Sequence, residues 1–134
     1  MGQQQLLLIV LGVIIVGIAV VVGINLFNAN ARESAKDTAV SEATNLGAMA
    51  QQYFKKPTAL GGGGNSFVGF GATSGTPHQV VPANLLSTQT CTYVISAQSL
   101  TNCTITGTPT LTDYTWTVVT TVTPTSITSA ITGS

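Results

Sequence analysis

The feature that most constrains this chain is a long apolar run near its amino terminus. From Leu6 to Ile24 every residue is apolar or glycine, and the first charged residue is Arg32. A helix needs about 20 apolar residues to cross the hydrocarbon core of a membrane, and this run comes close to that length. At roughly −0.3 to −0.6 kcal/mol for each Leu, Ile or Val, the run favours insertion into a membrane as a helix.

Two other interpretations of the run fit it less well. A cleaved secretory signal has a basic start, a short apolar core and a small-residue cleavage site, whereas the residues before Leu6 are uncharged and the run is long. The other alternative is a buried helix, but a chain of 134 residues is too small to surround a helix that is apolar on every face. The sequence therefore predicts a membrane-spanning hydrophobic helix over residues 1–24.

Residues 25–56 predict a continuation of the same helix. They include no proline, and Gly47 is their only glycine. Spacings of three and four place a stripe of small and apolar residues on one face of the helix, namely Ala35, Ala39, Ala43, Leu46, Ala50 and Tyr53. Lys55 and Lys56 lie in the last turn, where the helix dipole favours cations, and Pro57 ends the element. One continuous helix through both segments would be on the order of 75 Å long.

A glycine-rich connection over residues 57–65 is predicted to lead into a Thr/Ser-rich β domain over residues 66–134. Six segments are rich in Thr, Val, Ile and aromatic residues: SFVGFG, HQVV, TCTYVIS, LTNCTITG, YTWTVVTTV and TSITSAIT. In the fifth segment, alternate positions place on one face the residues Tyr114, Trp116, Val118, Thr120 and Val122. We therefore expect four or five antiparallel strands packed on the alanine stripe, which is an α+β fold with a protruding hydrophobic stalk.

The charge pattern limits the kinds of partner. Only 6% of the residues are charged and the net charge is zero, against about 25% charged residues in ordinary soluble domains. The charges are concentrated between Arg32 and Lys56, and Asp113 is the only one after them. This pattern provides neither the basic patch that binds nucleic acid nor a polybasic membrane patch. Glycans or neighbouring subunits are expected to cover a surface with so little charge.

Cys91 and Cys103 are the only cysteines of the chain. One pair in an uncharged, Thr-rich context favours a disulfide formed in an oxidising compartment, and two buried reduced thiols are the alternative. A hairpin that turns at Ser96, Ala97 and Gln98 would place the two cysteines opposite each other. Facing Cα atoms in an antiparallel pair are about 4.5–5.5 Å apart, which a disulfide can span.

No residue pattern in the sequence predicts catalysis or metal binding. His78 is the only histidine and has no acid or cysteine nearby in sequence, and Asp113 stands alone in the β domain. The GGGGNSF segment is no phosphate loop, because no strand precedes it and no Lys-Ser/Thr pair follows. We therefore expect that the protein is not an enzyme and holds no metal and no cofactor. A sequon for N-glycosylation begins at Asn102, which makes this residue a candidate glycosylation site.

A helix that is apolar all round in its first half and amphipathic in its second half resembles the N-terminal helix of type IV pilins and their relatives. The resemblance covers Met1 to about Lys56 and is one of architecture. It implies that a prepilin peptidase removes a basic leader, which explains the uncharged start. Met1 as the first mature residue fits the family better than cleavage after Gly2, which would place Leu7 at the fifth mature position. Gln5 then lies where the family usually has a glutamate. The assembly helix implied by the resemblance comprises Gln5, Leu6, Leu7, Leu8, Ile9, Val10, Leu11, Gly12, Val13, Ile14, Ile15, Val16, Gly17 and Ile18.

The function implied by the resemblance is structural. The helix would anchor the subunit in the inner or cytoplasmic membrane and would then become the core of an extracellular filament at the cell surface, a homopolymer built by the pilus assembly machinery. We therefore expect a major pilin. The alternatives are a minor pilin, a secretion pseudopilin or a single-pass anchored surface protein that binds a partner. The sequence disfavours a membrane-anchored enzyme because no catalytic constellation is present.

Overall fold

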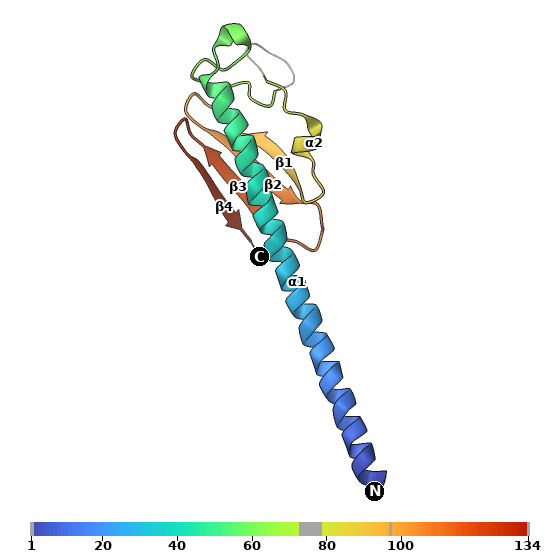
Figure 1. Cartoon of the computed structure of the whole chain (residues 1–134). Helices are drawn as coiled ribbons and strands as arrows, with labels where there is room; N and C mark the ends of the chain where they lie inside the picture. The colour runs from blue at the N-terminus through green and yellow to red at the C-terminus, as the bar shows by residue number, and fades with distance from the viewer. Residues whose placement is uncertain (1, 73–78, 97, 134) are drawn as a thin grey trace. The chain divides into compact units, whose positions relative to one another are not determined.

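The computed structural model describes residues 2–72, 79–96 and 98–133 of the chain. The chain divides into two compact units, Met1–Ser34 and Ala35–Ser134. One helix, α1 (Gly2–Lys55), supplies the described residues of the first unit and continues into the second. Within the second unit, α1 lies across one face of a four-stranded sheet (Figure 1). The fold is α+β, as the sequence predicts.

The single helix α1 confirms the predicted continuity between the apolar run and the amphipathic segment. Its sequence has no proline, and its second half is rich in alanine, the residue with the strongest helix propensity. Its buried residues are those of the alanine stripe with Gly47 in addition: Ala39, Ala43, Leu46, Gly47, Ala50 and Tyr53. Ala35 packs against the same core but stays partly exposed. The spacings of three and four therefore predicted the buried face of the helix correctly.

The glycine-rich segment caps the carboxyl end of α1. The last carbonyl groups of a helix have no partner within the helix. Here the N–H of Gly63 donates to the Tyr53 carbonyl oxygen at 2.8 Å. The N–H of Asn65 donates to the Phe54 carbonyl oxygen at 2.7 Å. A Cβ added at Gly63 would lie 1.9 Å from the Ser66 carbonyl oxygen, so a larger residue would require the backbone to shift.

The sheet is antiparallel throughout, in the strand order β1–β2–β3–β4. Its strands are β1 (Cys91–Ser96), β2 (Cys103–Pro109), β3 (Thr117–Val122) and β4 (Ile127–Thr132). Each strand coincides with or overlaps one of the predicted segments. A 3₁₀ helix (Thr58–Leu60) follows α1, and a short helix, α2 (Ala83–Leu86), precedes β1.

The core of the second unit lies between the alanine stripe and the inward face of the sheet. On β3 the alternating residues Val118, Thr120 and Val122 are buried. Trp116, which directly precedes the strand, is also buried, and Tyr114 is half-buried. The predicted shared face is therefore confirmed. It includes one polar residue, Thr120, whose hydroxyl pairs with that of Ser129 on β4 at 2.9 Å.

The prediction of strands in SFVGFG and HQVV was wrong. Among the described residues these two segments meet only at one parallel bridge, between Phe70 and Gln79, and His78 lies outside the described residues. Gly69 and Gly71 have φ angles of 96° and 80°, which turn the backbone away from an extended strand. At Gly71 an added Cβ would also lie 2.7 Å from the Cδ1 atom of Ile95.

The close packing of α1 on the sheet generates the first prediction. Ala43 is fully buried, so Ala43→Leu should overfill the core and lower the free energy of unfolding by about 1–3 kcal/mol. Asn45→Leu, at an exposed position of the same helix, is the matched control and should change that free energy by less than about 0.5 kcal/mol. Chemical denaturation followed by the fluorescence of Trp116, the only tryptophan, measures both. Equal effects of the two variants would contradict the packing described here.

Candidate functional site

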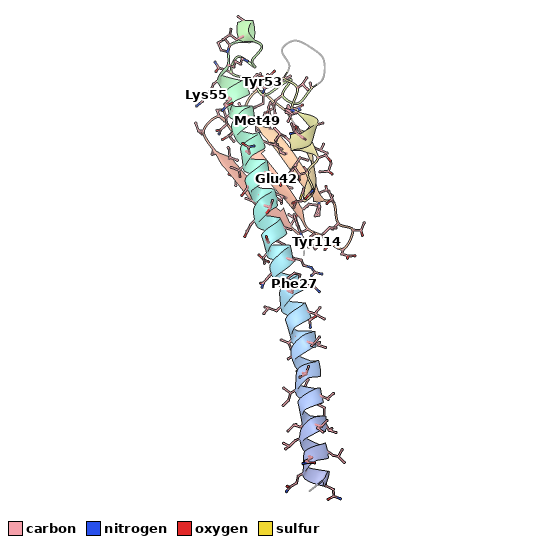
Figure 2. The ribbon with its side chains drawn as sticks, turned by 45° about the vertical axis from the view of Figure 1, so that its right-hand side comes forward. Phe27, Glu42, Met49, Tyr53, Lys55 and Tyr114 are labelled. Atoms are coloured by element: carbon pink, nitrogen blue, oxygen red, sulfur yellow. The ribbon has the colours of Figure 1, made fainter. Side chains whose placement is uncertain are left out.

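The candidate functional site is the apolar helix surface, which we define as α1 from Leu6 to Phe27 in the first unit. Its large apolar side chains keep between 50% and 73% of their area exposed. Figure 2 shows side chains projecting to both sides of the helix along this stretch. The residues predicted to form the assembly helix, Gln5 to Ile18, are all exposed.

An exposed apolar area of this extent needs a partner. The largest apolar patch of a soluble monomer rarely exceeds a few hundred Å², and each 100 Å² removed from water contributes about 2.5 kcal/mol. By length and composition, α1 includes a stretch apolar enough to cross a membrane, and no part of that stretch is buried within the protein. The geometry therefore identifies a surface for association with lipid or with other apolar helices.

Small residues make part of the apolar helix surface flat. Gly12, Ala19 and Gly23 are spaced by seven and four residues, which places them within about 40° of one another around the helix axis. A Cβ added at Gly12, Gly17 or Gly23 would have no heavy atom within 4 Å. Small residues in an apolar helix let a second helix approach closely wherever two such helices meet.

The second unit contains a polar cluster that joins α1 to β1 and that the sequence analysis missed. The carboxylate oxygen Oε2 of Glu42 accepts hydrogen bonds from the hydroxyl of Tyr93 and from that of Thr88, both at 2.8 Å. The Tyr93 hydroxyl also lies 3.2 Å from the carbonyl oxygen of Ala39. Glu42 follows Ala39 by three positions and thus borders the alanine stripe, which was the available signal in the sequence.

This polar cluster stabilises the packing of the sheet on α1. Burial, followed by the hydrogen bond to Glu42, raises the pKa of Tyr93 well above its usual range. The protonated hydroxyl is the form that donates to Glu42. Tyr93 thus supplies a hydrogen bond between β1 and α1.

The prediction of a disulfide between Cys91 and Cys103 was wrong, because both are free and buried. The register pairs Cys91 with Pro109 and Cys103 with Val122. Ser96 pairs with Thr104, so the hairpin is centred three residues beyond the predicted turn. Cys103 therefore lies six residues along β2 from Pro109, the residue opposite Cys91. At 3.3 Å per residue this separation is about 20 Å. A disulfide cannot span that distance.

The two free thiols have low reactivity. Burial raises the pKa of Cys103 to about 11 and also raises the pKa of Cys91, where the hydrogen bond with Tyr93 opposes the effect. The thiolate is the reactive form of cysteine, and the raised pKa keeps both residues protonated near neutral pH. Cys91 and Cys103 are thus apolar parts of the core.

Among the described residues, the remaining candidates Asn102 and Asp113 lie in separate turns. Asn102 is exposed in the turn between β1 and β2, where its Oδ1 atom accepts a hydrogen bond from the hydroxyl of Ser99 at 3.0 Å. Asp113 is exposed in a separate turn, and His78 lies outside the described residues. Over residues 2–72, 79–96 and 98–133 no three His, Cys, Asp or Glu side chains gather where they could hold a metal ion.

Comparisons of the chain with protein-family models, with curated proteins and with solved structures found no match. The architecture of the chain can still be described by itself. A long amino-terminal helix is apolar in its first half, and its second half packs on a small antiparallel sheet. This arrangement is consistent with that of pilin-like proteins.

The free cysteines generate a prediction about thiol chemistry. Cys91 and Cys103 should resist alkylation in the folded protein, because both side chains are fully buried. After unfolding without reductant, both should react completely. Mass spectrometry of the alkylated chain measures the number of modified thiols. If the unfolded chain gained label only after a reductant was added, the two cysteines would be joined by a disulfide and the assignment of free thiols would be wrong.

The raised pKa of Cys103 predicts a loss of stability at alkaline pH. In the folded protein this thiol keeps its proton up to about pH 11, whereas the unfolded chain loses it near the ordinary pKa of 9.0. Between these values the folded state binds more protons, so the free energy of unfolding falls as pH rises, by up to about 3 kcal/mol from this group. Denaturant titrations from pH 8 to pH 11 should show a shallower decline for Cys103→Ala. If the free energy of unfolding declined equally in the two proteins, the raised pKa assigned to Cys103 would be wrong.

Proposed function

We propose that this chain is a structural subunit, the major pilin, of an extracellular filament of the type IV pilus kind. The observation that carries the proposal is the apolar helix surface, whose large side chains keep at least half of their area exposed around the whole helix. The second unit has its own buried core, so it needs nothing from this surface in order to fold. The apolar helix surface is therefore free to serve contacts with other molecules.

Two surroundings would cover the apolar helix surface in succession. Before assembly it would lie in the inner or cytoplasmic membrane, where lipid covers all its faces. After export it would pack against the same helices of neighbouring copies at the axis of a filament, since water would otherwise surround it. Staggered helices make heterologous contacts that do not close on themselves, and such contacts produce helical filaments.

The β domain supports a structural role by its chemistry. The outward face of its central strands carries hydroxyl and small apolar side chains and no charge, with Thr104, Thr106 and Thr108 on β2 and Thr117, Val119 and Thr121 on β3. In the proposed filament these faces would lie outside the helical axis. We propose no catalytic activity, and a filament built from copies of this one chain needs no cofactor.

The proposal predicts that a charge within the apolar helix surface prevents assembly. Ile15 is 57% exposed in the single chain, so Ile15→Asp should leave the thermal unfolding of the β domain nearly unchanged. In a filament, the same substitution would bury a carboxylate among apolar helices at a cost of several kcal/mol. Electron microscopy of material sheared from cells should show filaments with the Ile15→Leu control and none with Ile15→Asp.

A second variant separates the filament from a simple membrane anchor. Gly12→Leu keeps the segment apolar, so membrane insertion is retained, but it adds a bulky side chain on the flat part of the helix. Filaments should be reduced or absent with this variant while the amount of protein in the membrane stays the same. If both Ile15→Asp and Gly12→Leu formed normal filaments, the apolar helix surface would not be the assembly surface. The alternative of a single-pass anchored surface protein would then replace the proposal.

A further inference from the structure

The two edges of the sheet are protected differently. The outer side of β1 is occupied by the segment after α2, where Ser87 forms an antiparallel bridge with Thr92. β4 lies at the other edge and pairs with β3. Across residues 2–72, 79–96 and 98–133 no further strand or bridge is present on the outer side of β4. Figure 1 shows this strand in dark red at the margin of the sheet, on the side away from α2.

β4 also lacks the features that usually block an open edge. Natural edge strands are short or carry charged side chains, proline or a bulge. β4 has six residues with the sequence ITSAIT and no charge or proline. Its pairing with β3 is regular, from Thr117 opposite Thr132 to Val122 opposite Ile127. The backbone groups on its outer side therefore form an ordered template for another strand.

The inward face of β4 indicates which strand fits this template. Ile127 packs against the core but is only half-buried, and Ile131 keeps 39% of its area exposed. The residues facing the same way on β3 are fully buried, so the apolar core has an open margin along β4. A strand that covers this margin must bring uncharged side chains, with apolar residues on the inward face at the same spacing.

A second copy of β4 meets these requirements. We propose that β4 of one copy pairs antiparallel with β4 of another copy, with Ser129 opposite its own counterpart. In this register Ile127 of each copy lies opposite Ile131 of the other. Since alternate residues of a strand share a face, these isoleucines extend the inward apolar face across the contact. On the outward face, Thr128 of each copy lies opposite Ala130 of the other.

This contact goes beyond the proposed function and does not depend on it. Both copies use the same surface, so the contact is isologous and closes as a pair. Contacts between staggered helices along a filament are heterologous and do not close. In a filament with its β domains outside, the β4 contact would join neighbouring filaments side by side.

The register can be tested by disulfide trapping in full-length chains that each carry one new cysteine, Thr128→Cys or Ala130→Cys. The chains are held in a non-ionic detergent, which covers the apolar helix surface. When the two variants are mixed and oxidised, the new thiols should lie on directly opposite residues, whose Cα atoms are about 4.5–5.5 Å apart, within the reach of a disulfide. A crosslinked dimer is expected on a non-reducing gel. Cys91 and Cys103 are buried and add no background.

Each variant alone is the control, because its new cysteine lies opposite a residue without a thiol. The expected result is a crosslinked dimer in the mixture and its loss in either single sample. No dimer in the mixture, or equal dimer in the single samples, would overturn the proposal. The fluorescence of Trp116 verifies that all the chains are folded.

A pair of lysines tests the same contact without chemistry on cysteine. Thr128→Lys combined with Ala130→Lys places like charges opposite each other in both halves of the contact, so the dimer in detergent should be lost. The matched control is Thr92→Lys combined with Val94→Lys on the outward face of β1, which should keep the dimer. Light scattering gives the mass of the protein. An unchanged dimer with the β4 lysines would overturn the proposal, whereas filament formation by Ile15→Asp tests the proposed function separately.

Discussion

The second unit depends on the close approach of one helix to one sheet, and small side chains make this approach possible. At Gly47 an added Cβ would lie only 3.1 Å from the Cγ2 atoms of Val122 and Ile127, so the helix backbone nearly touches the side chains of β3 and β4. The same proximity lets the hydroxyl of Tyr93 reach Glu42 on α1. A helix held farther away would lose both the packing and this hydrogen bond, so the stripe of alanine and glycine determines the thickness of the whole layer.

The two halves of α1 meet opposite physical demands with the same backbone. The amphipathic half obtains its partner from its own chain, and the carboxyl end of the helix is satisfied by N–H groups of the glycine-rich segment. The apolar half has no such partner within the described residues, and its large side chains remain exposed on all sides. A single chain thus contains one interface completed within itself and one apolar surface without a partner among the described residues, and this difference is the physical basis for the proposal of a filament.

Periodic features of this fold could be predicted from the sequence, and features set by contacts distant in sequence could not. Helix periodicity identified Ala39, Ala43 and Ala50 as buried, and strand alternation identified the inward face of β3. The predicted register of the hairpin was wrong because the turn was placed midway between the two cysteines. The polar residues that make the turn are Ser99 and Asn102, whose backbone N–H and carbonyl pair at 2.8 Å. The cluster at Glu42 was missed because its partner Tyr93 is 51 residues away in sequence, a separation that no local pattern bridges.

The free cysteines have a consequence for how this domain reaches its stable form. A small domain that relies on a disulfide reaches its stable form only where an oxidant and its enzymes are present. In this domain Cys91 and Cys103 are separate parts of an apolar core, and the hydrogen bonds and packing that hold the fold are indifferent to redox potential. The described fold of the β domain therefore needs no oxidation step that joins these two cysteines.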